Sequence, residues 1–389
     1  MQIHTVKPGD TIFKIARQYS TSPMKIIENN ELENPDRLSV GQKLLILTPT
    51  RTYTTRGSDT LERIADRFGV TKESLYRSNP YLYGSDKLYP GQVLAIKYDT
   101  PPYGMACANG YYYNGTSADR LSLVLPYLTY ITLGVGRRDK DGIELLFDDT
   151  DVVAMAKERG RIPLMRVYDG ESGFSDAYAD TLILLAKTHG YGGITLASYR
   201  AMRENKAEYE EFLMKLKKRL MEHDLRLFCE LDGNRDTRLA DVCDGYVIMY
   251  EKSSLDNIPT FEDGERRVMT EFAEHSEPSK AYIELPSLGY MGDEELLLTE
   301  AERLAHAAGQ EILFDGEKKI SHFHYNKYRG GKRERVRVAY ESLENAKAKL
   351  DLAGELGFMG VAFDIMRVPV SYLMMFDTSF RRPTLYSDM

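Results

Sequence analysis

Two hydrophobic periodicities divide this chain into a short first part and a long second part. In roughly the first hundred residues, apolar side chains recur at the i, i+3, i+4, i+7 spacing of a helix that buries one face. This happens twice, at Ile12, Ile15, Ala16 and Tyr19 and again at Leu61, Ile64, Ala65 and Phe68. Later, short strand-like runs alternate with amphipathic helical stretches, which is typical of a parallel sheet with crossover helices.

The first part is an internal repeat with an offset of about 49 positions. Residues 4–47 contain "HTVKPGDTIFKIA" and "LSVGQKLLI", and residues 53–97 contain "YTTRGSDTLERIA" and "LYPGQVLAI". Each unit predicts a short strand, a helix that an Asp-Thr pair can cap, a second short helix ending at Asn30 or Asn79, and a closing strand. We therefore expect two small βααβ modules, at residues 1–48 and 52–98.

The second part predicts one large α/β domain over residues 103–389. Amphipathic stretches such as "AEYEEFLMKLKKRLMEH" separate most of its candidate strands, and this order and size favour a (β/α)8 TIM barrel. Residues 312–340 alternate like an antiparallel hairpin, so we expect a small β insertion there. The candidate strands are "CANGYYYN", "YLTYITLGVG", "IPLMRVYD", "GGITLAS", "LRLFCELD", "GYVIMYE", "KAYIELPSLGY" and "GVAFDIM".

Composition narrows the classes of function. The net charge of -8 and the scattered basic residues argue against nucleic-acid and membrane partners. Three cysteines are too few and too dispersed for a disulfide framework or a zinc site, and no metal or cofactor is expected. No secretory signal is visible in "MQIHTVKPGDTIFKIA", so conventional export is not expected.

Both N-terminal units resemble LysM domains, most specifically at "KPGDTIFKIA" and "LSVGQKLLI". The resemblance implies binding of N-acetylglucosamine-containing glycans, with peptidoglycan or chitin as the partner. Asp10 and Asp59 have a second interpretation as helix caps only, and Asn30 and Asn79 as helix C-caps only. The second unit departs from the family pattern at Ser58, where glycine is usual. The implied glycan-binding residues are Gly9, Asp10, Thr11, Ile12 and Asn30 to Pro35 in the first unit, and Asp59, Thr60, Leu61, Asn79 and Pro80 to Leu82 in the second.

The whole chain resembles spore cortex-lytic and spore-coat members of glycoside hydrolase family 18, with the best local barrel matches at "GYYYNG" and "VAYESLENAKAKLDLAGELGFMGVAFDI". Active members carry Asp-Gly-x-x-x-Asp-x-Glu on the fourth strand. Its glutamate is the general acid, and the aspartate two residues earlier positions the substrate's acetamido nucleophile. In register, this chain has Gly192, Thr195, Ala197 and Tyr199, without any carboxylate. The ordinary tyrosine pKa of about 10 makes Tyr199 a poor acid.

Other side chains could still act at the barrel mouth. The chain has no tryptophan, and the place of the family's last-strand tryptophan falls on Asp364. Glu230 and Asp364 are surrogate carboxylates near strand ends, as are Asp169, Glu171, Asp232 and Glu251. Tyr112 and Tyr250 are candidate rings for stacking on a sugar.

Three functions remain open. The first is a glycan-binding protein whose barrel is a pseudoenzyme, and the second is an active N-acetylglucosaminidase with a relocated acid. The third is a structural protein of the spore coat that contacts other coat proteins. The resemblance places the chain in the mother-cell cytoplasm and then in the spore coat, cortex or cell wall.

Overall fold

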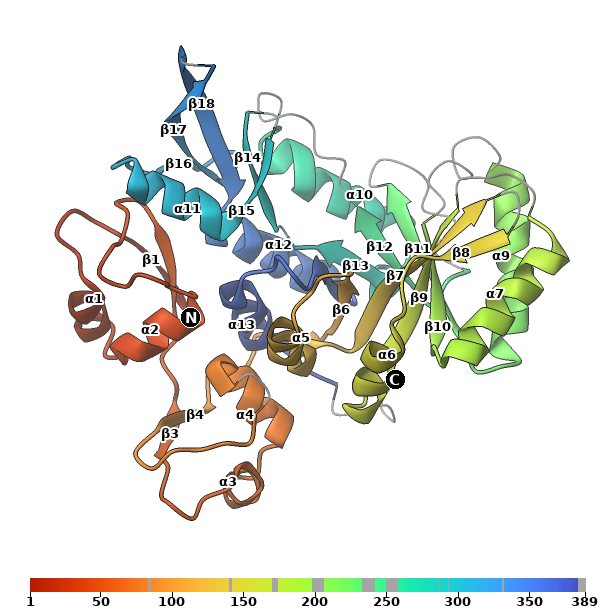
Figure 1. Cartoon of the computed structure of the whole chain (residues 1–389), viewed down its shortest axis with the longest axis horizontal. Coiled ribbons are helices and arrows are strands. Elements are labelled where there is room, and N and C mark those ends of the chain that lie inside the picture. Colours follow the sequence, from red (N-terminus) through yellow and green to blue (C-terminus); the bar gives the residue numbers. More distant parts are fainter. Residues whose placement is uncertain are drawn as a thin grey trace.

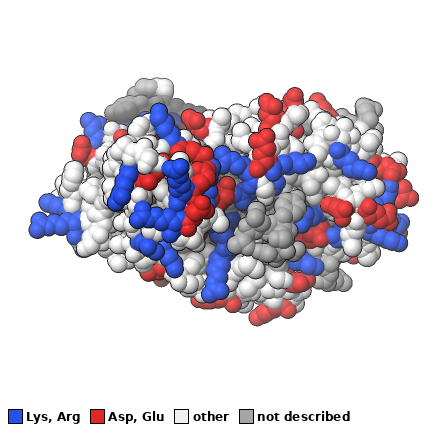
Figure 2. Space-filling view, turned by 90° about the horizontal axis from the view of Figure 1, so that it is seen from below, with Lys and Arg blue, Asp and Glu red and all other residues white. Residues whose placement is uncertain are grey.

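The computed structural model describes residues 1–82, 85–139, 142–169, 174–197, 206–232, 242–249, 258–285, 287–292, 294–330 and 332–383. Figure 1 shows two small N-terminal modules beside a large barrel, with a sheet rising from the barrel's side. No helix in these ranges has the length and apolarity that crossing a membrane requires. In the view of Figure 2, basic and acidic side chains are intermingled across the surface.

The two N-terminal modules have the same architecture. In each, an antiparallel strand pair packs on two helices, and the apolar stripe that the sequence predicts is the core. Thr11 and Thr60 cap the first helix of each module, because their hydroxyls accept the N–H groups of Lys14 and Arg63 at 3.3 Å. The elements are β1 (Gln2–Thr5), α1 (Ile12–Gln18), α2 (Pro23–Asn29) and β2 (Lys43–Ile46), then β3 (Arg51–Thr54), α3 (Leu61–Phe68), α4 (Lys72–Ser78), the 3-10 turn η1 (Pro80–Leu82) and β4 (Val93–Lys97).

The large domain is a closed parallel barrel, as predicted. Its strands run in the order β6-β7-β9-β10-β11-β12-β13-β19, and β19 returns to pair with β6. These strands are β6 (Cys107–Tyr112), β7 (Tyr130–Asp139), β9 (Ile162–Asp169), β10 (Gly193–Ala197), β11 (Arg226–Asp232), β12 (Gly245–Met249), β13 (Ala281–Glu284) and β19 (Gly360–Asp364). A short strand β8 (Gly142–Leu145) pairs antiparallel with the end of β7.

Helices surround the barrel, and strand alternation creates two packed layers. Tyr111, Leu164 and Phe228 belong to a cluster inside the barrel, whereas Ile194, Leu196 and other residues of opposite parity pack against the helices. The helices are α5 (Ala118–Val124), α6 (Thr150–Glu158), α7 (Asp176–His189), α9 (Lys206–Met221), α10 (Arg267–His275), α12 (Leu343–Leu356) and α13 (Val370–Ser379).

The insertion is a five-stranded antiparallel sheet with one helix. The antiparallel hairpin that the sequence alternation predicts is confirmed by the pairing of β17 with β18. Assigning Leu288–Tyr290 to a barrel strand was wrong: β13 ends at Glu284, and β14 pairs with β15 and β18 instead. The elements are β14 (Leu288–Met291), β15 (Glu294–Leu297), α11 (Leu298–Ala307), β16 (Leu313–Asp315), β17 (Ile320–Arg329) and β18 (Lys332–Glu341).

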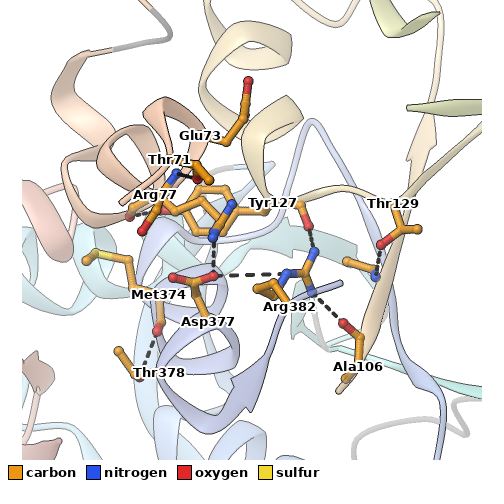
Figure 3. A network of polar contacts seen from close by, with 12 residues as sticks. Thr71, Glu73, Arg77, Ala106, Tyr127, Thr129, Met374, Asp377, Thr378 and Arg382 are labelled. Carbon is orange, nitrogen blue, oxygen red and sulfur yellow. Dashed lines mark hydrogen bonds and ion pairs between the residues drawn. The ribbon is translucent and has the colours of Figure 1, made fainter. Parts of the chain in front are cut away.

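Both N-terminal modules are docked onto the large domain. The second module is held by a polar network (Figure 3), in which Asp377 on α13 pairs with Arg77 on α4 at 2.6 Å and the Tyr127 hydroxyl donates to the Arg77 carbonyl at 2.6 Å. Nearby, Glu73 pairs with Arg161 at 2.8 Å. These residues are far apart in the sequence, so the docking of the second module could not be predicted from any local sequence pattern.

Candidate functional site

The loop before α1 is shaped by Asp10. Its carboxylate accepts the backbone N–H of Lys7 at 2.8 Å and contacts His4 Nε2 at 2.9 Å. These two hydrogen bonds lower the pKa of the Asp10 carboxyl below its usual value, and the bond from Lys7 has the larger effect. Lys14 donates to the Gly9 carbonyl at 2.7 Å, so hydrogen bonds hold the loop to the strand before it and to the helix after it.

The second module repeats this loop with different side chains. Asp59 accepts the Arg56 N–H at 2.6 Å and the Tyr53 hydroxyl at 2.8 Å, and these bonds lower the pKa of its carboxyl. Arg63 donates to the Ser58 carbonyl at 3.1 Å. In both modules the cap is therefore the threonine, and the aspartate holds the turn that precedes it.

Several residues that the resemblance assigns to the glycan also have partners inside their own modules. Ile12 and Leu61 are buried in the cores of their modules. Asn30 donates to the carbonyls of Ile26 and Leu45 and accepts the Leu45 N–H, all within 2.9 Å. Asn79 makes the same three bonds, at 2.8 Å each, to Leu75 and Ala95. The two asparagines therefore fasten α2 and α4 to their closing strands.

The loop after α2 lines an open cleft. This cleft has a volume of about 580 Å³ and lies between residues 30–37 of the first module and helix α11 of the insertion. Leu32 and Pro35 are half-buried and Asn34 is exposed, so part of the predicted glycan loop is accessible.

The corresponding loop of the second module is packed against protein. Pro80 and Leu82 are buried, and η1 contacts α2 of the first module and α5 of the large domain. The Lys25 amine of α2 donates to the Asn79 side chain at 2.9 Å and lies 4.4 Å from the centre of the Tyr81 ring. Burial lowers the pKa of Lys25 to about 8. The two modules thus differ: one loop faces a cleft and the other is covered.

The described positions of the degenerate motif lie on β10. Thr195 and Ala197 share the parity of the barrel interior and are buried, and Gly192 precedes the strand and donates its N–H to the Pro163 carbonyl at 2.8 Å. The Thr195 hydroxyl is buried and has no hydrogen-bond partner among the described residues. At these positions the barrel offers neither an acid nor a carboxylate that could position an acetamido group.

A buried ion pair crosses this part of the barrel. Arg166 on β9 and Glu230 on β11 form a bidentate pair, with Nε–Oε1 at 2.5 Å and Nη2–Oε2 at 2.6 Å. Since β10 lies between these two strands, the pair spans the small side chains of Thr195 and Ala197. Glu230 is fully buried, and its carboxylate is bound to the guanidinium. A bidentate pair of this kind fixes both side chains in the barrel interior and gives each buried charge a counter-ion.

Asp364 and Tyr112 have different surroundings. Asp364 ends β19, where it accepts the Met366 N–H at 2.8 Å and pairs with Arg367 at 3.4 Å. Burial raises the pKa of the Asp364 carboxyl despite Arg367 nearby. Tyr112 packs on the helix side against Phe147, with ring centres 6.2 Å apart, and its role as a stacking ring at the barrel mouth stays a prediction. Strand alternation instead directs Tyr111 and Tyr113 inward.

The remaining candidates of the mouth cannot be placed. Tyr199, Tyr250, Glu171 and Glu251 lie outside the described residues, and the side chains of Asp169 and Asp232 are not described. Arg166 was not among the predicted site residues, although a charged residue inside the apolar run "IPLMRVYD" was a visible signal. Helix α11 was not predicted to line the site, because no local pattern links that helix to the first module.

Comparisons with known proteins agree with this architecture. The LysM domain family model matches residues 4–47 and 53–97, so both modules are LysM domains. A putative sporulation-specific glycosylase of Bacillus subtilis, YdhD, is 27% identical over 238 residues, which are 57% of this chain and 56% of that protein. The chain spans only 38% and 33% of two other curated relatives, an endolysin of Bacillus phage B103 and a cell wall-binding protein of B. subtilis.

Solved structures show the fold of the whole chain. The spore cortex-lytic enzyme SleL of Bacillus megaterium superimposes with a TM-score of 0.73 at 23% identity, covering 98% of both chains. A chitinase of Chromobacterium violaceum superimposes with a TM-score of 0.61 at 16% identity, covering 70% of this chain and 98% of the other. This chain thus shares its fold with SleL over nearly the whole of both chains, and with the chitinase over 70% of its length.

Proposed function

We propose that this protein binds the N-acetylglucosamine-containing glycan of peptidoglycan through its LysM domains, and that its barrel does not hydrolyse that glycan. The two LysM matches support the binding, and the names of cell-wall and spore relatives agree with it. A place in the spore cortex or cell wall follows, with spore-coat proteins as neighbours.

The observation that carries the second half of the proposal is the interior of β10. Thr195 and Ala197 stand at places that the family 18 resemblance assigns to motif carboxylates, and the Arg166–Glu230 pair crosses above them. Loss of a positioned acid costs about 10²- to 10⁴-fold in rate, before the lost acetamido-positioning group is counted. Substrate-assisted hydrolysis needs both groups.

Two assays with the full chain test the proposal. Purified peptidoglycan should retain the protein in a sedimentation assay, whereas the same material should release no soluble fragments during prolonged incubation. Cortex material containing muramic-δ-lactam serves as a second substrate. Absence of sedimentation would overturn the binding claim, and fragment release above that of heat-treated protein would overturn the claim that the barrel is inactive.

One observation favours a second candidate, an N-acetylglucosaminidase with Asp364 as its acid. This carboxyl lies at the carboxyl end of a barrel strand, and burial raises its pKa toward the range of a general acid. Turnover that is abolished by Asp364→Asn, with unchanged glycan sedimentation, would select this function over the first.

A further inference from the structure

The cleft beside the first LysM domain has walls from two parts of the chain that are far apart in sequence. Leu32, Asn34 and Arg37 line it from the loop after α2, and Thr299, Glu302 and Arg303 line it from α11 of the barrel insertion. Its volume of about 580 Å³ lies within the range of small-molecule sites in proteins.

Both walls are fixed in place by hydrogen bonds. Gln42 donates to the Glu302 carboxylate at 2.9 Å, and the Ile312 N–H donates to the Val40 carbonyl at 2.9 Å. On the other side of the loop, Glu31 pairs with Arg120 at 2.8 Å and accepts the Val370 N–H at 2.7 Å. A ligand entering the cleft therefore meets preorganised walls and pays little for ordering them.

The lining suits an uncharged, polyhydroxylated ligand with acetamido groups. Both carboxylates and guanidinium groups line the cleft, and Arg303 lies 3.6 Å from Glu300 on the same helix. Such paired charges offer donors and acceptors to hydroxyl and amide groups without the excess of positive charge that a phosphate site needs. Leu32 and Leu297 add apolar surface for an acetyl methyl group or a sugar face.

We infer that α11 forms the second wall of the first LysM domain's glycan site, so that an N-acetylated glycan held by residues 30–37 also contacts Thr299, Glu302 and Arg303. This inference rests on the proposed glycan binding and extends it: the barrel domain takes part in recognition through its insertion. In the second LysM domain the corresponding segment η1 is packed against α2 and α5.

A blocking substitution tests the inference in the full chain. Thr299 is exposed on the cleft side of α11, whereas Ala307 is exposed on the same helix but does not line the cleft. We expect Thr299→Trp to weaken the binding of tetra-N-acetylchitotetraose, measured by titration calorimetry, by roughly tenfold or more. The matched variant Ala307→Trp should bind like the parent protein. Equal affinity of the two variants would overturn the inference.

A second pair of variants tests the inference without introducing a large side chain, in case the tryptophan variants do not fold. Arg303→Ala removes a cleft guanidinium, and Arg267→Ala removes an exposed guanidinium from α10 that also has a helical glutamate partner, Glu271. Weaker binding only for Arg303→Ala supports a glycan contact from α11, and equal binding by both argues against it. If the parent protein binds neither the oligosaccharide nor peptidoglycan, the proposed function itself fails, which is a distinguishable result.

Discussion

At the scale of single residues, the chain has several buried ionisable groups whose partners decide what they can do. Glu230 and Asp364 are both carboxyls near the barrel mouth, yet one is held by a guanidinium and the other ends a strand in a tight turn. Their different surroundings imply different responses to substitution, because removing one partner of a buried pair leaves an uncompensated charge.

Glu230→Gln should therefore destabilise the fold. Arg166 is 4% exposed and would lose its counter-ion, so we expect the free energy of unfolding in urea to fall by about 3 kcal/mol or more. Glu144→Gln is the matched control, since Glu144 pairs with Arg137 at 2.7 Å on the surface and contributes about 0–1 kcal/mol. A catalytic Glu230 would behave in the opposite way, losing turnover while keeping its stability.

Glu302 predicts a pH dependence of stability. Burial raises the pKa of its carboxyl to about 7, above the value of about 4.5 that we take for the unfolded chain, despite the opposing hydrogen bond from Gln42. The folded state then binds the proton more tightly, so this group lowers stability as the pH rises from about 4.5 to 7 and its penalty is complete above that range. Near pH 5 the carboxyl is neutral in the folded protein and adds little cost.

Glu302→Gln should accordingly raise the melting temperature at pH 8 and change it little at pH 5. The gain at pH 8 should be about 1–3 kcal/mol, since the half-buried side chain is partly screened by solvent. Glu300→Gln on the same helix controls for loss of a carboxylate from α11. A melting profile that both substitutions change equally would contradict the prediction.

At the scale of elements, most of the architecture could be predicted because it is encoded locally. Helix stripes such as Ile12 and Ile15, threonine caps and strand alternation each need only a few consecutive residues. The barrel strands were found for the same reason. Leu288–Tyr290 was misassigned because a short apolar run has the same pattern whether its partners belong to the barrel or to an inserted sheet.

The candidate site was less predictable, because it depends on contacts between distant elements. Repeat symmetry predicted equivalent loops at Asn30 and Asn79, but only the structure shows that Lys25 reaches the second loop. Gln42 and Glu302 are 260 positions apart, and nothing in either local pattern indicates that they meet. Alternation alone predicts that Tyr111 and Tyr113 face opposite to Tyr112, but only the closed barrel shows that these two face inward.

At the scale of the whole molecule, the first LysM domain and the barrel insertion act as one unit. Gly41, in the turn before β2, has a φ of +86°, and a Cβ built there would lie 1.8 Å from the Ile312 carbonyl oxygen. Gly91 occupies the same turn in the second LysM domain with a φ of +85°, and a Cβ there would meet nothing within 4 Å. The two glycines share their backbone conformation and differ only in whether another part of the chain touches them.

This pair of glycines separates domain docking from turn stability. Gly41→Ala and Gly91→Ala should both cost about 1–2 kcal/mol, since both place a side chain in the left-handed region. Only Gly41→Ala should also force the first LysM domain away from Ile312, so we expect faster hydrogen exchange in α11 and a larger radius of gyration in solution scattering. If α11 forms part of the glycan site, the same variant also binds tetra-N-acetylchitotetraose more weakly, while Gly91→Ala does not. Identical exchange and scattering for the two variants would show that the close approach at Gly41 does not hold the domains together.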